Sequence, residues 1–266
     1  MQHSRTVRLA CVYCAYVFVV LFGIGFVGFA GFLPPPSPAV SADEITRFLF
    51  DDVVAVRVGL CIQLFASALL LPWGAAVASQ IKQVEGRFSP LAYAWIAATG
   101  CIVMEFLFPA MFWAAAVFRP EDSPELIRKF NDLAWLPWLG IISTGVVQAL
   151  ALAIVAFTDT STRPAYPRWF GYFQVFVAIT LSPADLDLFL KTGPIAWDGV
   201  VTFWLPVTAA FAWIVVTTAM TARAVKAAPD PDDEHADLAA RIAALESALE
   251  KRTGTVAPRG QEPVDV

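Results

Sequence analysis

Residues 9–33 read LACVYCAYVFVVLFGIGFVGFAGFL, a run of 25 positions without one charged side chain. A helix needs about 20 apolar residues to cross the hydrocarbon core of a bilayer. The run is therefore long enough for a transmembrane helix, and it predicts that the chain enters a membrane close to its N-terminus.

The composition of the whole chain indicates that this helix is one of several. Hydrophobic residues make up 58% of the 266 positions, whereas charged residues make up 15%, compared with about 25% in soluble domains. Residues 223–266 hold 15 of the 41 charged residues. The first 222 residues carry too few charges to cover a soluble surface, so the sequence predicts an all-α, polytopic membrane helix bundle.

Six segments are apolar enough to span the membrane. The predicted spans are residues 9–33, 58–79, 90–118, 133–157, 169–190 and 199–222. The fifth is the weakest, because two aspartates and a proline interrupt its last third, and its helix is expected to end near Leu181. The transmembrane domain is predicted to cover residues 1–226.

The distribution of lysine and arginine predicts the orientation, because basic loops tend to remain cytoplasmic. A cytoplasmic N-terminus places eight basic residues inside and six outside. We therefore predict that both termini are cytoplasmic. A cleaved signal peptide ending near residues 40–42 is the alternative, but the apolar run is longer than the 7–15 residues typical of such peptides.

Three predicted outer connections share a serine followed by acidic residues, which is typical of a helix start. The serines are Ser41, Ser123 and Ser182, and a phenylalanine follows each by seven positions. This pattern favours a threefold repeat of helical hairpins, although the uneven spacing of the serines leaves a chance similarity as the alternative. The first outer helix is amphipathic and is expected either to lie on lipid headgroups or to cap the bundle.

Five tryptophans fall near the predicted outer ends of the spans. Aromatic residues often form a belt at the membrane interface, and this interpretation is favoured here. The five residues are Trp113, Trp135, Trp138, Trp197 and Trp204.

Glu105 is the outstanding polar residue of the spans, because it lies near the middle of residues 90–118. A carboxyl at this depth is costly and often marks a pathway or a proton site. Pro109 leaves the backbone carbonyl of Glu105 without its helical hydrogen bond. Arg57, Gln63 and Gln148 are candidate partners in an intramembrane polar site. A purely structural, hydrogen-bonded Glu105 is the alternative reading.

Other chemistry finds little support in the sequence. Only two histidines are present, His3 and His235, and both lie outside the spans, so neither a metal nor another cofactor is predicted. Cys11 and Cys14 have redox spacing but lie within a predicted span, where small packing residues are favoured. No catalytic constellation is found, and the net charge of −5 argues against nucleic-acid binding.

The C-terminal segment is predicted to form a cytoplasmic helix. Residues 227–231 are expected to be a linker, residues 232–252 a helix and residues 253–266 a disordered tail. A short heptad seam runs along this helix, and it predicts a protein partner or self-association. The seam consists of Leu238, Ile242, Leu245 and Leu249.

Three motifs resemble an uncharacterised family of actinobacterial and proteobacterial membrane proteins. They are GFLPPPSP at 31–38, FPAMFW at 108–113 and KTGP at 191–194. The resemblance covers roughly residues 8–222. It implies a multi-pass protein of the bacterial inner membrane and no assigned activity.

Two hypotheses about function follow. The favoured one is a non-catalytic accessory or scaffold subunit of a membrane complex, because the spans contain few polar residues. The alternative is a carrier or binder of a small apolar or weakly acidic solute, including a lipid, in an outward-facing cavity near Glu105.

Overall fold

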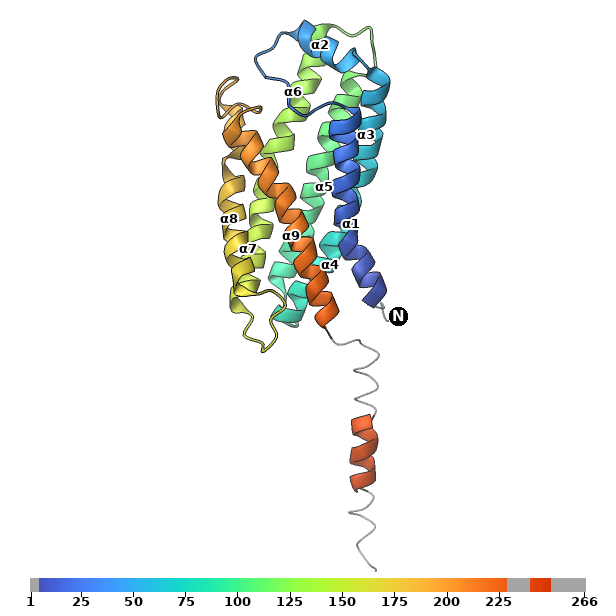
Figure 1. The fold of residues 1–266 in the computed structure, drawn as a ribbon, viewed down its shortest axis with the longest axis vertical. Helices are drawn as coiled ribbons and strands as arrows, with labels where there is room; N and C mark the ends of the chain where they lie inside the picture. The colour runs from blue at the N-terminus through green and yellow to red at the C-terminus, as the bar shows by residue number, and fades with distance from the viewer. Residues whose placement is uncertain (1–4, 229–239, 250–266) are drawn as a thin grey trace, which may run out of the picture.

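The computed structural model describes residues 5–228 and 240–249, and residues 5–228 form a bundle of helices (Figure 1). No strand occurs in these two ranges. The elements are α1 (Arg5–Gly23), the π-helix η1 (Ile24–Phe29), α2 (Ala42–Phe50), α3 (Val53–Ser67), α4 (Leu70–Glu85), α5 (Pro90–Ala116), α6 (Pro124–Gly140), α7 (Ser143–Thr158), α8 (Arg168–Leu181), the 3-10 helix η2 (Ser182–Leu188), the π-helix η3 (Val200–Trp204) and α9 (Leu205–Ala227).

Within the described ranges, five helical stretches are long and apolar enough to cross a membrane. They are Arg5–Phe29, Val53–Glu85, Pro90–Ala116, Pro124–Thr158 and Val200–Ala227. Large apolar side chains such as Phe65, Phe176 and Ile179 lie exposed on the outer surface of the bundle. The chain is thus an all-helical, polytopic membrane bundle whose surface is compatible with contact to lipid.

Two of these stretches extend beyond the predicted spans 58–79 and 133–157, because polar caps start their helices earlier. The Asp52 carboxylate accepts the backbone N–H of Ala55 at the start of α3. The Ser123 hydroxyl accepts that of Leu126 at the start of α6. Capping satisfies backbone donors that the first turn of a helix leaves free, so the polar first turns are helical too.

The predicted fifth span differs most from the structure. Helix α8 has 14 residues, which corresponds to a rise of about 21 Å, against about 30 Å for the hydrocarbon core. As the sequence indicates, the α-helix ends at Leu181, and the chain continues in the 3-10 helix η2. The described bundle therefore contains five long spans and one short pass.

The start of α1 and the end of α9 lie at the same end of the bundle (Figure 1). The Arg5 guanidinium there donates a hydrogen bond of 3.0 Å to the carbonyl of Ala228. Six passes along the bundle, with α8 as the short one, return the chain to the face where it began. We call this face the N-terminal face and the opposite one, which α2 crosses, the α2 face.

Helix α2 settles whether the first outer helix lies on lipid or caps the bundle. Ser41 and Glu44 form a complete capping box at its start. The helix buries Ile45 and Leu49 and packs against α6 and α3. It therefore caps the end of the bundle, as Figure 1 shows.

Helices begin at all three predicted positions, but Ser41 and Ser123 cap theirs, whereas Ser182 is the first residue of the 3-10 helix η2 and does not cap it. The Ser182 hydroxyl does not cap a new helix but donates 2.7 Å to the carbonyl of Ala178 in α8. The chain enters η2 directly from α8, so the first N–H groups of η2 are not left free for the serine to cap.

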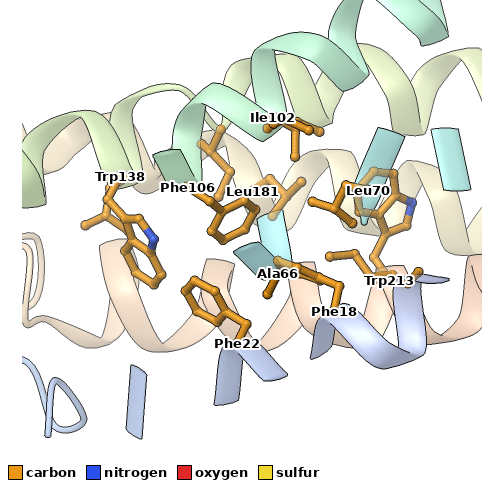
Figure 2. Packing of buried hydrophobic residues seen from close by; sticks show 14 of the residues in the cluster. Phe18, Phe22, Ala66, Leu70, Ile102, Phe106, Trp138, Leu181 and Trp213 are labelled. Atoms are coloured by element: carbon orange, nitrogen blue, oxygen red, sulfur yellow. The ribbon is translucent and has the colours of Figure 1, made fainter. Parts of the chain in front are cut away.

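The interior of the bundle is packed with aromatic rings. Figure 2 shows Phe18 and Phe22 of α1 among residues of the surrounding helices, including Phe106 and Trp138. The Phe22 and Phe106 ring centroids are 5.0 Å apart. Such edge-to-face contacts add to the gain from burial.

The prediction of an interfacial tryptophan belt is wrong for four of the five residues. Trp113, Trp135, Trp138 and Trp197 are buried, and Trp204 alone of the five is exposed. The Trp113 and Trp135 rings contact each other with centroids 5.0 Å apart. The sequence indicates how far along a span a residue lies but not which face of the helix it occupies. The four buried tryptophans lie on helix faces that point into the bundle.

The C-terminal segment is described in part. Residues 240–249 are helical and include Ile242, Leu245 and Leu249 of the predicted seam. Leu238, most of the predicted linker and the predicted disordered tail at 253–266 lie outside the described residues.

Candidate functional site

Glu105 lies in the third span, on α5, with its side chain 8% exposed. Pro109 lies inside the same helix, one turn further on. Among the described residues, no side chain hydrogen-bonds to the Glu105 carboxyl. The residue is thus buried in the bundle without a compensating partner of the kind a purely structural carboxyl normally has.

Two of the three predicted partners of Glu105 are engaged elsewhere. Arg57 donates to the carbonyl of Val117 at the end of α5. The Gln148 amide donates to the carbonyl of Trp95 and to the Thr99 hydroxyl, at 3.1 and 2.8 Å.

Gln63 lies at the contact between α3 and the first span, where a Cβ added to Gly25 would be 3.2 Å from its Cγ. Its Nε2 atom is buried without a hydrogen-bond partner. The structure therefore does not assemble Glu105, Arg57, Gln63 and Gln148 into one hydrogen-bonded site.

A different carboxyl approaches Glu105. Asp185, on η2, is close enough for its charge to act on Glu105. Its Oδ1 atom is buried without a hydrogen-bond partner and faces α6, where a Cβ added to Gly140 would lie 4.0 Å away. Asp185 thus connects the interior position of Glu105 with the end of α8.

Asp187 continues this series toward the α2 face. It is 4% exposed, and no side chain donates to either of its carboxyl oxygens. It lies beyond the end of α8, outside the membrane-spanning helices. Burial raises the pKa of Asp187 to about 7, and the charge of Asp185 adds to the rise, while the backbone N–H of Leu188 opposes it. Burial likewise raises the pKa of Asp185.

Asp187 lines a cavity of about 220 Å³ that we call the outer cavity. Helix α6 contributes Arg128, Lys129 and Asp132, and the segment after η2 contributes Lys191 and Trp197. The Trp197 indole N–H donates 2.8 Å to the carbonyl of Pro36, which fixes this wall. Three basic and two acidic side chains therefore surround one small cavity.

An α-helix through Asp185 and Asp187 would hold the two carboxyls on different faces, because residues two apart are separated by about 160°. In a 3-10 helix, which has three residues per turn, residues two apart are separated by about 120° rather than about 160°. The two carboxyls are then near enough to interact. The proline at position 183 was the available signal that regular α-helix ends there.

Glu105, which the sequence predicted beside a cavity, does not line the outer cavity. The carboxyls that line it are those of Asp187 and Asp132. Within the described residues, no group of three or more histidine, cysteine, aspartate or glutamate side chains is arranged to hold a metal ion.

Comparisons with protein-family models, curated proteins and solved structures found no match to this chain. The site must therefore be interpreted from its own chemistry.

Proposed function

We propose that this integral membrane protein binds and carries a small, weakly acidic solute at the outer cavity. The observation that carries the proposal is Asp187, a buried carboxyl without a side-chain partner, lining a cavity with three basic residues. A buried polar group without a partner is costly, and a bound solute supplies the missing one.

The charges of the cavity select the solute. Arg128, Lys129 and Lys191 attract a monoanion such as a carboxylate. Because burial raises the pKa of Asp187 to about 7, its carboxyl can stay protonated near neutral pH and donate a hydrogen bond to a bound carboxylate. At about 30 Å³ per water, the cavity of about 220 Å³ has room for roughly seven waters, so the solute is small.

The series Asp187, Asp185 and Glu105 supports carriage rather than binding alone. The three carboxyls lead from the outer cavity to the interior of α5, and the charge of Asp185 acts on both of the others. Protonatable residues inside membrane bundles commonly mark proton pathways. A weak acid and its proton then enter the bundle by the same route.

Isothermal titration of the purified protein with lactate, and with lactamide as the uncharged control, tests the binding step. We expect lactate to bind and lactamide not to bind. Lys191→Gln should weaken lactate binding about tenfold, because a charge-assisted contact is lost. Arg119→Gln is the matched control, since Arg119 is an exposed cation on the same face outside the cavity. Equal binding of lactate and lactamide would refute the proposal.

Carriage is tested in proteoliposomes. Labelled lactate should enter faster when the external solution is more acidic than the lumen, and Glu105→Gln should slow uptake while leaving lactate binding intact. If Glu105→Gln binds and carries lactate as the unchanged protein does, the carboxyl series has no part in carriage.

A second candidate function is that of an accessory subunit docked through the C-terminal helix. The observation that favours it is the exposure of Ile242 and Leu245, 48% and 65%, on helical residues 240–249. Removal of residues 229–266 should then release co-purifying proteins from the gently solubilised complex. An unchanged set of co-purifying proteins would exclude this role for the helix.

A further inference from the structure

A second cavity, of about 290 Å³, lies near the N-terminal face, where α1, α4 and α9 pack against one another. We call it the α1–α4 groove. Its walls are mostly apolar and include Val7, Cys11, Pro72, Ala75 and Val225. Small side chains on α4, Ala75 among them, leave the space that the groove occupies.

The polar atoms of the groove without partners are donors. Arg8 and Gln80 both line it. Gln80 is 1% exposed, and its Nε2 atom is buried without a hydrogen-bond partner. The Nε and Nη2 atoms of Arg8 are buried and unpartnered as well. The Ser79 side chain also lines the groove, and its hydroxyl already donates a hydrogen bond of 2.8 Å to the carbonyl of Ala75.

Within residues 5–228, no acidic residue of the N-terminal face pairs with these donors. Two acidic residues lie at that face within residues 5–228, and both accept backbone N–H groups. Glu85 accepts from Leu91 and Ala92, and Asp159 accepts from Ser161 and Ala165. Buried, unpartnered donors beside a cation, with these two acids engaged elsewhere, suit a bound anion.

The surroundings of the groove indicate where that anion comes from. Val7 and Leu71, which flank it on α1 and α4, are exposed apolar residues of membrane-spanning helices. A molecule that fills the groove therefore meets apolar walls on the bilayer side and donors near the end of the bundle. This arrangement fits an amphiphile with an acidic head.

We propose that the α1–α4 groove binds an anionic phospholipid of the surrounding leaflet, whose phosphate accepts hydrogen bonds from Arg8 and Gln80 and whose acyl chain lies against Pro72 and Ala75. Arginine offers several N–H donors in a fork that suits phosphate oxygens. The basic character of the N-terminal face, with eight basic residues and two acidic ones within residues 5–228, draws anionic lipid toward it. This site is separate from the outer cavity and does not depend on the function proposed there.

Native mass spectrometry of the purified protein in a neutral detergent, titrated with phosphatidylglycerol, tests the proposal. Phosphatidylcholine with the same acyl chains is the matched lipid control. We expect tighter binding of phosphatidylglycerol, and about a tenfold loss of affinity in Arg8→Gln. Ala75→Leu, which narrows the groove without changing any charge, should also weaken binding. Because Ala75 is exposed, this variant is expected to fold normally.

Arg87→Gln separates a specific site from general attraction to a basic face. Arg87 is an exposed cation of the same face outside the groove, so its loss should change affinity by no more than about twofold. An equal loss in Arg87→Gln and Arg8→Gln would overturn the proposal. So would full displacement of the lipid by inorganic phosphate, which would identify a site for a free anion, or unchanged binding in Ala75→Leu.

Discussion

Asp187 shows at the scale of one residue how the end of a short helix creates a titratable site. Its carboxyl is buried, and its pKa of about 7 lies above the ordinary value of 3.8. A group whose pKa is raised by folding favours the folded state when protonated. Asp187 therefore contributes its full stabilisation below about pH 4. This stabilisation decreases as the pH rises from about 4 to about 7, and it is lost above about pH 7.

This loss of stability with rising pH can be tested in the detergent-solubilised protein. The thermal midpoint should fall between pH 4 and pH 7, and Asp187→Asn should make that fall shallower, because asparagine does not ionise. Differential scanning fluorimetry across the pH range measures both curves. Asp51→Asn, an exposed carboxyl on the same face, should leave the slope unchanged. If the thermal midpoint of Asp187→Asn fell with pH as steeply as that of the unchanged protein, the raised pKa of Asp187 would be contradicted.

Gly59 lies where the backbones of α3 and the first span approach each other closely, so a side chain at this position should affect stability. A Cβ at this position would lie 2.5 Å from the carbonyl oxygen of Gly25 and 2.9 Å from the backbone nitrogen of Ala30. These are backbone atoms that cannot move aside cheaply. Gly59→Ala is thus expected to separate α3 from the first span and to destabilise the protein by about 1–3 kcal/mol.

The matched control is Gly23→Ala. A Cβ at Gly23 meets nothing within 4 Å, and alanine is the better helix former. We expect Gly23→Ala to keep or raise the thermal midpoint and Gly59→Ala to lower it. Equal midpoints for the two variants would mean that the helices do not approach as closely as the structure shows.

At the scale of the element, the caps of α2 determine how firmly it closes the α2 face. Ser41 and Glu44 satisfy each other's backbone N–H groups, and losing a cap of this kind costs about 1 kcal/mol. Ser41→Ala should therefore increase amide hydrogen exchange over residues 42–50 while leaving α5 unaffected. Ser79→Ala, which removes a hydroxyl bonded only within α4, serves as the control. Unchanged exchange in α2 would show that packing against α6 alone holds the helix.

The same scale shows which elements the sequence could predict. Helix starts at Ser41 and Ser123 were predictable, because capping depends on neighbouring residues alone. The burial of Trp135 was not, since it depends on where α6 faces the first span. The interaction of Asp185 with Glu105 was not predictable either, because it joins segments 80 positions apart and requires a 3-10 turn after α8. Local chemistry can be read from sequence, whereas convergence of distant segments cannot.

At the scale of the whole molecule, charge is divided unequally between the two faces of the bundle. Within residues 5–228, the N-terminal face carries eight basic and two acidic residues, and the α2 face carries six basic and eleven acidic ones. The sequence margin of eight basic residues against six was thin. It remains the basis of the expectation that the N-terminal face is cytoplasmic, because lysine and arginine set the orientation and acidic residues contribute little.

Cysteine labelling in intact cells measures this orientation. In a background with the four native cysteines replaced by alanine, Glu121→Cys reports the α2 face and Arg87→Cys the N-terminal face; both positions are exposed. A membrane-impermeant maleimide should label Glu121→Cys in intact cells and Arg87→Cys only after the cells are opened. The reverse pattern would place the outer cavity in the cytoplasm and the α1–α4 groove in the opposite leaflet. Because the binding tests use purified protein, either pattern leaves their outcomes independent of the orientation.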